Sequence, residues 1–245
     1  MYKNITLKIE QDYETLSIKA AQIFAKSITE NPSKCFGFAT GATPIGMYKE
    51  LVKMHQQDKL NFSEMCSFNL DEYHPIAPDS PQSYRYFMNE NLFSHVNINK
   101  NNIFIPDSKA ADPQMEAKEY EAKIETKGGI EMQILGIGVN GHIGFNEPTD
   151  SFSADTRYTA LAKATINANA RHFDNAEDMP THAITMGIRS IMLAKHILLL
   201  ANGVSKATIL KDALYGAITP LVPASVLQLH PSVTVVVDKE AAKLL

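Results

Sequence analysis

Short apolar runs alternate along the chain with longer stretches whose hydrophobic positions recur at helical spacing. The apolar runs predict strands over residues 34–40, 65–70, 102–105, 130–136, 196–201 and 233–237. The helical patterns between them predict helices over residues 44–54, 84–93, 113–126 and 206–215. The chain therefore reads as a strand–helix alternation from end to end.

Residues with strong positional preferences mark the ends of these helices. Thr43 is the expected N-cap of the helix at 44–54, with Pro44 in its first turn. Ser205 is the expected N-cap of the helix at 206–215, which Gly216 ends. Gly128 and Gly129 are expected to end the helix at 113–126.

The predicted strands are continuously apolar, which is typical of a parallel sheet covered on both faces. With the strand–helix alternation, this predicts a single open, doubly wound, mostly parallel sheet with helices on both faces, a Rossmann-like α/β fold. We expect one domain over residues 1–245, since no repeat or linker divides the chain. Ligands of such sheets bind beyond the carboxyl ends of the strands, which directs attention to residues 40–44, 69–81, 136–148 and 202–206.

Composition narrows the class of protein. The 245 residues carry 23 Lys and Arg against 27 Asp and Glu, and this net charge of −4 argues against a nucleic-acid partner. The N-terminal segment lacks an apolar signal core, and the longest apolar run, 197–201, is too short to cross a membrane. Cys35 and Cys66 cannot form a disulfide framework, so we expect small buried thiols and a reducing, cytoplasmic location.

The loop at 40–44 joins a predicted strand to a helix N-terminus. Free N–H groups and the helix dipole favour an anion there, and small residues let it approach the backbone. Gly41 and Gly46 have the spacing of a triphosphate-binding loop, but Met47-Tyr48 replaces the required Lys-Ser/Thr. A single phosphoester is the favoured ligand, and an ordinary capped turn is an equally good interpretation of this motif alone.

Asp71 and Glu72 follow the strand at 65–70. A partly buried carboxylate there can act as a general base, and only one of two neighbours in an extended segment can face a ligand. Taken alone, a solvated turn is the better interpretation of this pair.

The loop at 136–148 contains a literal GxGxxG at Gly136, Gly138 and Gly141, directly after a strand. A dinucleotide site would need a helix to begin there, and residues 142–148 have no helical apolar pattern. We therefore expect a loop that presents Asn140, His142 and Glu147 together, with the histidine able to move protons near neutral pH. No other histidine has metal-ligand spacing, so no metal is expected.

Three isolated cations, Arg157, Arg171 and Lys206, are individually more typical of surface charges. A phosphoester ligand nevertheless needs one or two such groups, and Lys206 follows a strand on the ligand side of the predicted sheet.

Five segments taken together resemble one family. They are TGATPIGMYKEL, FNLDEYHP with PQSYRYFMNENLF, GIGVNGHIGFNEP, TRYTALAKATINANARHF and LQLHPSVTVVVD. The chain resembles the glucosamine-6-phosphate deaminase/isomerase family, which shares its fold with the 6-phosphogluconolactonases. The resemblance implies conversion of glucosamine 6-phosphate and water to fructose 6-phosphate and ammonia, a step of amino-sugar catabolism, with no cofactor and no metal.

The resemblance also implies roles for particular residues. His142 would open the sugar ring with help from Glu147 and Asn140, and Asp71 would move a proton from C2 to C1 through an enolamine. Gly41, Ala42 and Thr43 would cradle the phosphate, and Arg171 and Lys206 would neutralise it.

Two departures from the family pattern matter. Many relatives carry Asp at position 140, and Asn140 can orient His142 but cannot stabilise its cation by charge. Relatives regulated by N-acetylglucosamine 6-phosphate carry a basic residue where Thr159 stands and have a longer C-terminal tail, so we expect no such regulation. A homo-oligomer, familiar among the longer relatives, stays open, as does a preference for galactosamine 6-phosphate.

Two other functions stay open on the sequence. One is a hydrolase that opens a phosphosugar lactone with His142 as base. The other is a non-catalytic sugar-phosphate sensor, against which stand the negative net charge and the presence of Asp71, His142 and Glu147.

Overall fold

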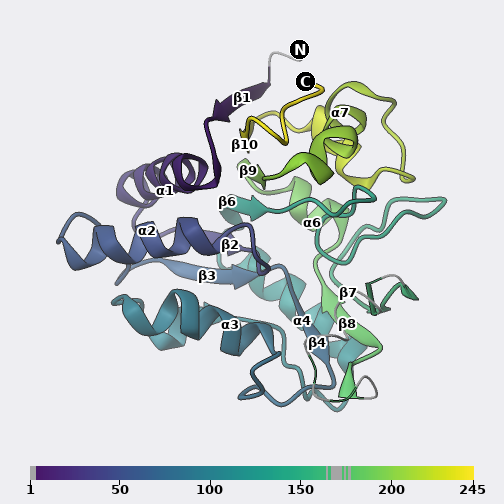
Figure 1. Cartoon of the computed structure of the whole chain (residues 1–245). Helices are drawn as coiled ribbons and strands as arrows, with labels where there is room; N and C mark the ends of the chain where they lie inside the picture. Colours follow the sequence, from purple (N-terminus) through teal and green to yellow (C-terminus); the bar gives the residue numbers. More distant parts are fainter. Residues whose placement is uncertain (1–3, 164, 167–172, 174, 176–177) are drawn as a thin grey trace.

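A seven-stranded parallel sheet forms the centre of the protein in the computed structural model, which describes residues 4–163, 165–166, 173, 175 and 178–245 (Figure 1). Its strand order is β1-β10-β9-β6-β2-β3-β5, and every neighbouring pair is parallel. The strands are β1 (Ile5–Glu10), β2 (Cys35–Phe38), β3 (Cys66–Asn69), β5 (Ile103–Phe104), β6 (Ile130–Leu135), β9 (His196–Ala201) and β10 (Val233–Asp238). The predicted α/β class is confirmed.

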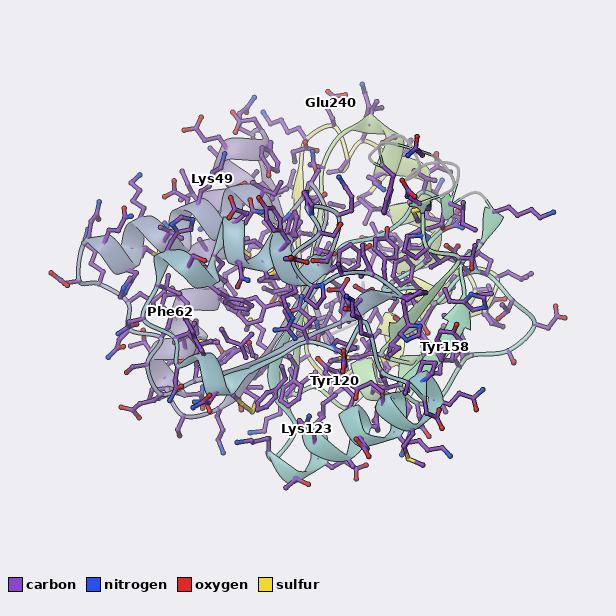
Figure 2. The ribbon with its side chains drawn as sticks, turned by 90° about the horizontal axis from the view of Figure 1, so that it is seen from below. Lys49, Phe62, Tyr120, Lys123, Tyr158 and Glu240 are labelled. Carbon is purple, nitrogen blue, oxygen red and sulfur yellow. A yellow bond between two sulfur atoms is a disulfide. The ribbon has the colours of Figure 1, made fainter. Side chains whose placement is uncertain are left out.

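Helices pack on both faces of this sheet. They are α1 (Tyr13–Glu30), α2 (Ile45–Gln56), α3 (Tyr84–Asn91), α4 (Pro113–Thr126), α6 (Ile188–Met192) and α7 (Ala207–Tyr215). Phe24 of α1 packs edge-on against Phe36 and Phe38 of β2. Phe68 is in register with Gly37 and therefore points to the face opposite Phe36 and Phe38, where it packs against Tyr120 of α4. Tyr120 is labelled in Figure 2. The two aromatic clusters show why α1 and α4 cover opposite faces.

A second, antiparallel sheet extends the fold in a way that the sequence pattern did not predict. It has the order β4-β8-β7, with β4 (Asp71–His74), β7 (Arg157–Ala160) and β8 (His182–Thr185). β4 follows β3 after the single residue Leu70, so one chain segment contributes to both sheets. These strands are short and half-polar, which is why hydrophobic periodicity missed them.

The chain reverses its direction of sheet growth between β2 and β6. From β2 it adds β3 and β5 on one side, and from β6 it adds β9 and β10 on the other. The loops after β2 and β6 diverge at this switch point and leave a crevice at the carboxyl edge of the sheet.

Two predicted helix caps are wrong. The helix α2 starts at Ile45 with Pro44 as N-cap, and Thr43 lies outside it. Its hydroxyl donates instead to Oδ1 of Asn202 at 2.9 Å, a partner 159 residues away in the chain. Ser205 is also not a cap, because it lies within a 3₁₀ turn, Val204–Lys206, that leads into α7.

The sequence analysis also missed β1 and α1. The signal for α1 was present: Asp12 and Thr15 form a reciprocal capping box at its start. Leu16, Ala20 and Phe24, spaced four residues apart, are buried along its inner face.

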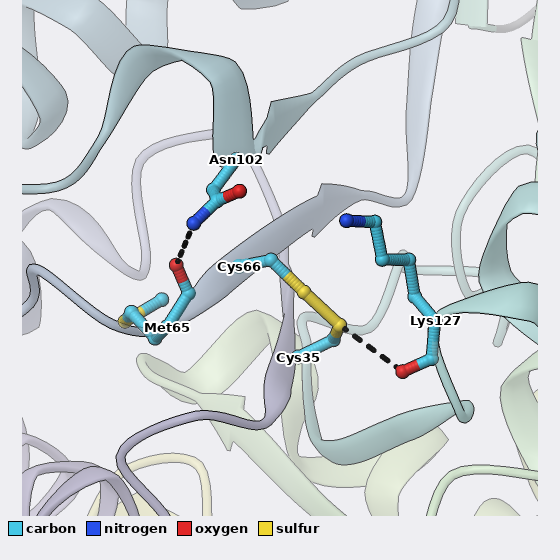
Figure 3. The surroundings of a disulfide bond; sticks show 5 residues. All are labelled: Cys35, Met65, Cys66, Asn102 and Lys127. Carbon is cyan, nitrogen blue, oxygen red and sulfur yellow. Dashed lines mark hydrogen bonds between the residues drawn. A yellow bond between two sulfur atoms is a disulfide. The ribbon is translucent and has the colours of Figure 1, made fainter.

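Cys35 and Cys66 form a disulfide, which corrects the expectation of two buried thiols (Figure 3). They are the first residues of β2 and β3, directly opposite in register, with Cα atoms 4.4 Å apart. Strand pairing therefore brings together two cysteines that 31 positions separate in the chain.

None of the described helices is both long and apolar enough to span a membrane.

Candidate active site

A cavity of about 540 Å³ occupies the crevice at the carboxyl edge of the sheet. All four post-strand loops singled out in the sequence contribute to its wall. The lining residues include Thr40, Gly41, Ala42, Thr43, Asp71, Tyr84, Gly138, His142, Phe145, Thr165 and Lys206. The structure thus brings together most of the predicted site residues from segments far apart in the chain.

Asn140, His142 and Glu147 form a hydrogen-bonded triangle, and His142 is the member that lines the cavity. Nδ1 of His142 lies 2.7 Å from Oδ1 of Asn140, and the amide of Asn140 donates to Oε2 of Glu147 at 2.7 Å. Because an amide oxygen can only accept, Nδ1 of His142 carries the proton. This leaves Nε2 of the ring to exchange protons with a ligand.

Glu147 is held as an anion beside His142. Nδ1 of His142 lies 3.3 Å from Oε2 of Glu147, and the hydroxyl of Thr165 donates to Oε1 at 2.6 Å. Burial opposes ionisation of this carboxyl, but hydrogen bonds from His142, Thr165 and Asn140 outweigh it and lower its pKa to about 2. An ionised Glu147 supplies the negative charge that Asn140 cannot supply to an imidazolium.

One glycine of the GxGxxG pattern, Gly138, makes room for the histidine side chain. No helix begins at residues 136–148, which confirms the rejection of a dinucleotide loop. The imidazole of His142 lies directly against Gly138, where any Cβ would overlap the ring. The close approach requires glycine at this position.

Asp71 and Glu72 point to opposite sides of β4, as the alternation of a strand dictates. Asp71 is only 6% exposed and lines the cavity, whereas Glu72 does not. The carboxylate of Glu72 accepts from the N–H groups of Tyr84 and Arg85, both at 2.8 Å, at the start of α3. Only one of the two neighbouring acids therefore faces a ligand.

The surroundings of Asp71 make it a strong base when it is ionised. Burial, with a contribution from the charge of Glu72, raises the pKa of Asp71 to about 8. Burial likewise raises the pKa of Glu72 to about 7, against the N–H groups of Tyr84, Arg85 and Tyr73. A carboxyl with such a pKa can both take up and return a proton near neutral pH.

The loop at 40–44 forms the rim of the cavity, where Gly41 has φ +99°. Tyr13, which the sequence analysis missed, lies behind this loop. Its hydroxyl is 3.0 Å from the carbonyl of Ala42 and 3.1 Å from that of Thr43, and it accepts from the N–H of Gly46 at 2.9 Å. The hydroxyl of Tyr13 thus lies within hydrogen-bond distance of two carbonyl oxygens of this loop.

Among the described residues, Lys206 is the basic side chain that lines the cavity. Its Nζ donates to the carbonyl of Ile137 at 2.7 Å, and burial lowers its pKa. Arg171, the other predicted phosphate ligand, lies outside the residues that the structure describes.

Tyr84, Phe145 and Thr165 also line the cavity and were missed. Tyr84 stacks on Phe145 with ring centroids 6.1 Å apart. Tyr84 lies in the predicted helix at 84–93, and Phe145 belongs to the predicted loop, but neither residue type signals a ligand contact by itself. Only the fold places both rings on the cavity wall with Asp71.

Comparison with known proteins shows a family match over most of the chain. The family model of glucosamine-6-phosphate isomerases/6-phosphogluconolactonase matches residues 11–236. A glucosamine-6-phosphate deaminase of Thermoanaerobacter pseudethanolicus is 52% identical over 237 residues, covering 97% of this chain and 94% of the relative. One of Clostridium perfringens is 49% identical over 239 residues, covering 98% and 99%.

Solved structures give the same result. A monomeric glucosamine-6-phosphate deaminase, 43% identical, superposes with a TM-score of 0.94 and covers 98% of this chain and 100% of its own. The 6-phosphogluconolactonase of Trypanosoma brucei shares the fold at 17% identity, with a TM-score of 0.79 and full coverage of both chains. The fold and cavity define an α/β enzyme of sugar-phosphate metabolism. The chain belongs to the glucosamine-6-phosphate isomerase/6-phosphogluconolactonase family.

Proposed function

We propose that this enzyme deaminates glucosamine 6-phosphate, giving fructose 6-phosphate and ammonia. One observation carries the proposal: a buried carboxyl of raised pKa and an oriented histidine line the same cavity, beside a small-residue loop at a helix start. Deaminases about 50% identical over nearly the whole chain support the same substrate.

Ring opening is the step we assign to His142. Its Nε2 accepts the proton of the anomeric hydroxyl and delivers a proton to the ring oxygen, so the C1–O5 bond breaks and a C1 aldehyde forms. The imidazolium formed in passing lies against the anionic Glu147, while Asn140 keeps the ring in position.

Isomerisation is the step we assign to Asp71. The ionised carboxylate removes the C2 proton while the C1 oxygen takes a proton from the ammonium group of the substrate, which gives a neutral enolamine. Asp71 then returns its proton to C1, leaving a protonated imine at C2. Water adds to C2 and the C–N bond breaks, so fructose 6-phosphate is released with ammonia, which carries the remaining proton away as ammonium.

Phosphate binding is assigned to the loop at 40–44 with Lys206 and Arg171. The N–H groups of Gly41 and Ala42 at the start of α2 suit an anion, and Lys206 lines the same cavity. The hydroxyl of Thr43, which donates to Asn202, would have to turn towards the phosphate.

An assay of ammonia release and of fructose 6-phosphate formation tests the function. Asp71→Asn is expected to abolish exchange of the C2 proton with solvent and to keep binding of the substrate, because the amide cannot accept that proton. Asp79→Asn, an exposed acid of the following loop, is the matched control and keeps full activity.

Normal turnover by Asp71→Asn would overturn the assignment of the base. Faster hydrolysis of 6-phosphogluconolactone than conversion of glucosamine 6-phosphate by the wild type would overturn the function. Galactosamine 6-phosphate, assayed in parallel, determines the preferred configuration at C4.

We further propose a monomer that needs no metal and no organic cofactor, in line with a relative that is described as monomeric. Sedimentation at micromolar concentration tests the subunit count.

Full activity is expected after treatment with a chelator. Addition of N-acetylglucosamine 6-phosphate is expected to leave hyperbolic kinetics unchanged, because Thr159 supplies no charge.

A further inference from the structure

Arg157 is the first residue of β7. Its guanidinium donates hydrogen bonds to two consecutive residues of the loop that carries His142 and Glu147. Nη1 donates to Oδ1 of Asn146 at 2.8 Å, and Nη2 donates to the carbonyl of Phe145 at 3.3 Å. This fork geometry is specific to arginine, because a lysine ammonium offers a single donor centre.

Asn146 passes this contact on to the base of the site. Its buried amide group donates to the carbonyls of Ile143, at 2.7 Å, and Met186, at 2.9 Å. The N–H of Met186 in turn donates to the carbonyl of Leu70, the residue before Asp71, at 2.8 Å. A continuous series of hydrogen bonds therefore leads from Arg157 to the backbone at Asp71.

Strand register provides a second connection between the same two residues. Asp71 on β4, Thr185 on β8 and Arg157 on β7 form one row across the antiparallel sheet. The hydroxyl of Thr185 accepts from the N–H of Phe145 at 3.1 Å. Side chains of one row point to the same face, so Thr185 and Arg157 both support the loop beside Asp71.

The loop crosses very close to Asp71 at Gly144, which has φ +57°. A Cβ there would lie 3.1 Å from Oγ1 of Thr185 and 3.5 Å from Oδ2 of Asp71. A small shift of residues 143–146 therefore changes the separation of Asp71 from His142 and Glu147, which flank this segment.

Arg157 has no ion-pair partner among the residues that the structure describes. Its charge is instead directed at the neutral oxygens of Asn146 and Phe145, and burial lowers its pKa. Hydrogen bonds from a charged donor are stronger than neutral ones, which suits a role in holding a loop.

We propose that Arg157 is a positioning residue for catalysis: by holding Asn146 and the carbonyl of Phe145, it sets the distance between Asp71 and the His142–Glu147 pair. The inference rests on the proposed deaminase reaction. Arg157 does not line the cavity, and its side chain donates to Asn146 and Phe145 and to none of residues 40–44, so its effect falls on the proton-transfer steps and not on substrate binding.

The test compares Arg157→Met, Arg157→Lys and the control Arg189→Met, an exposed arginine paired with Asp155. Each variant is assayed for kcat and KM with glucosamine 6-phosphate, for affinity for glucose 6-phosphate by calorimetry, and for melting temperature. We expect Arg157→Met to lose about 100-fold in kcat, because a misplacement of about 1 Å has that effect, with KM and affinity changed less than about threefold. Arg157→Lys is expected to recover part of kcat, since it keeps one charged donor, and Arg189→Met to behave as wild type.

The outcomes separate the inference from the proposed function. A wild type inactive on glucosamine 6-phosphate would overturn the function, whereas an active wild type whose Arg157→Met variant keeps its kcat would overturn only the role of Arg157. A rise in KM at constant kcat would equally overturn it. If Arg157→Met does not fold, Arg157→Lys decides, and wild-type kcat in that variant would overturn the inference.

Discussion

Asp71 and Glu72 are neighbours in the chain with different roles: Asp71 is the proposed base, and the charge of Glu72 helps to raise its pKa. Asp71 faces the cavity with a pKa of about 8, and Glu72 is turned towards the start of α3. Since the proposed base must be ionised, kcat/KM is expected to increase as the pH rises towards about 8 and to level off above it. A pH profile of kcat/KM measures this, and a rate already constant from about pH 5 upwards would contradict it.

Removing the charge of Glu72 is expected to shift this profile. Because that charge raises the pKa of Asp71, the substitution Glu72→Gln lowers this pKa and moves the rising limb of the profile to lower pH. The new amide side chain keeps an oxygen for the N–H groups of Tyr73 and Tyr84 and loses the acceptor for the N–H of Arg85, so the melting temperature of the variant is measured beside the profile. Glu64→Gln, at an exposed position, is the control, and a shift to higher pH in Glu72→Gln would refute the electrostatic argument.

At the scale of elements, the junction between α1 and α2 positions the loop at 40–44, which we propose binds the phosphate. Tyr13→Phe removes the hydroxyl that holds the carbonyls of Ala42 and Thr43 and accepts from Gly46. Losing these hydrogen bonds is expected to weaken substrate binding by about 1 kcal/mol, because the loop is less well ordered. This raises KM about fivefold and leaves kcat unchanged. Tyr215→Phe, an exposed tyrosine on α7, should leave both constants as they are. A fall in kcat alone would place Tyr13 elsewhere in the mechanism.

The disulfide joins two elements, β2 and β3, at the ends opposite the cavity. Replacing both cysteines by alanine is expected to lower the free energy of unfolding by about 4 kcal/mol, because the closed loop spans 31 residues, and to leave kcat unchanged. Urea denaturation without reductant measures the loss. Alkylation of the unfolded, unreduced wild type should label no thiol, and two labelled thiols would show that the bond does not form.

For the whole molecule, we expect the buried carboxyl of Asp71 to lower the free energy of unfolding. Asp71 has a raised pKa in the folded state, so between its unfolded value of 3.8 and about 8 the native protein binds more protons than the unfolded chain. The contribution of this group to stability therefore falls as the pH rises through that range. Asp71→Asn is expected to melt higher than the wild type, with a larger gain at about pH 8 than at about pH 5. An equal gain at both pH values would contradict this linkage.

The division between local and long-range information explains what could be predicted. The helix at 113–126 and the strand at 196–201 were predicted with their observed bounds, because periodicity and end signals specify them locally. Thr43 was misassigned because its hydroxyl has a partner on a distant loop, Asn202, that competes with the local cap. The disulfide was missed because strand register, and not sequence spacing, brings Cys35 and Cys66 together.

The sequence by itself determined the α/β class and the loops that carry the site, because apolar runs and helical periodicity are local and the carboxyl ends of parallel strands meet at one edge. Only the tertiary structure decided which acid faces the cavity, through the antiparallel pairing of β4 with β8. It also decided that Arg157 donates to Asn146 and that the hydroxyl of Tyr13 lies against the loop at 40–44. These contacts join residues that are polar, isolated in their local patterns and brought together by packing, so no short stretch of sequence encodes them.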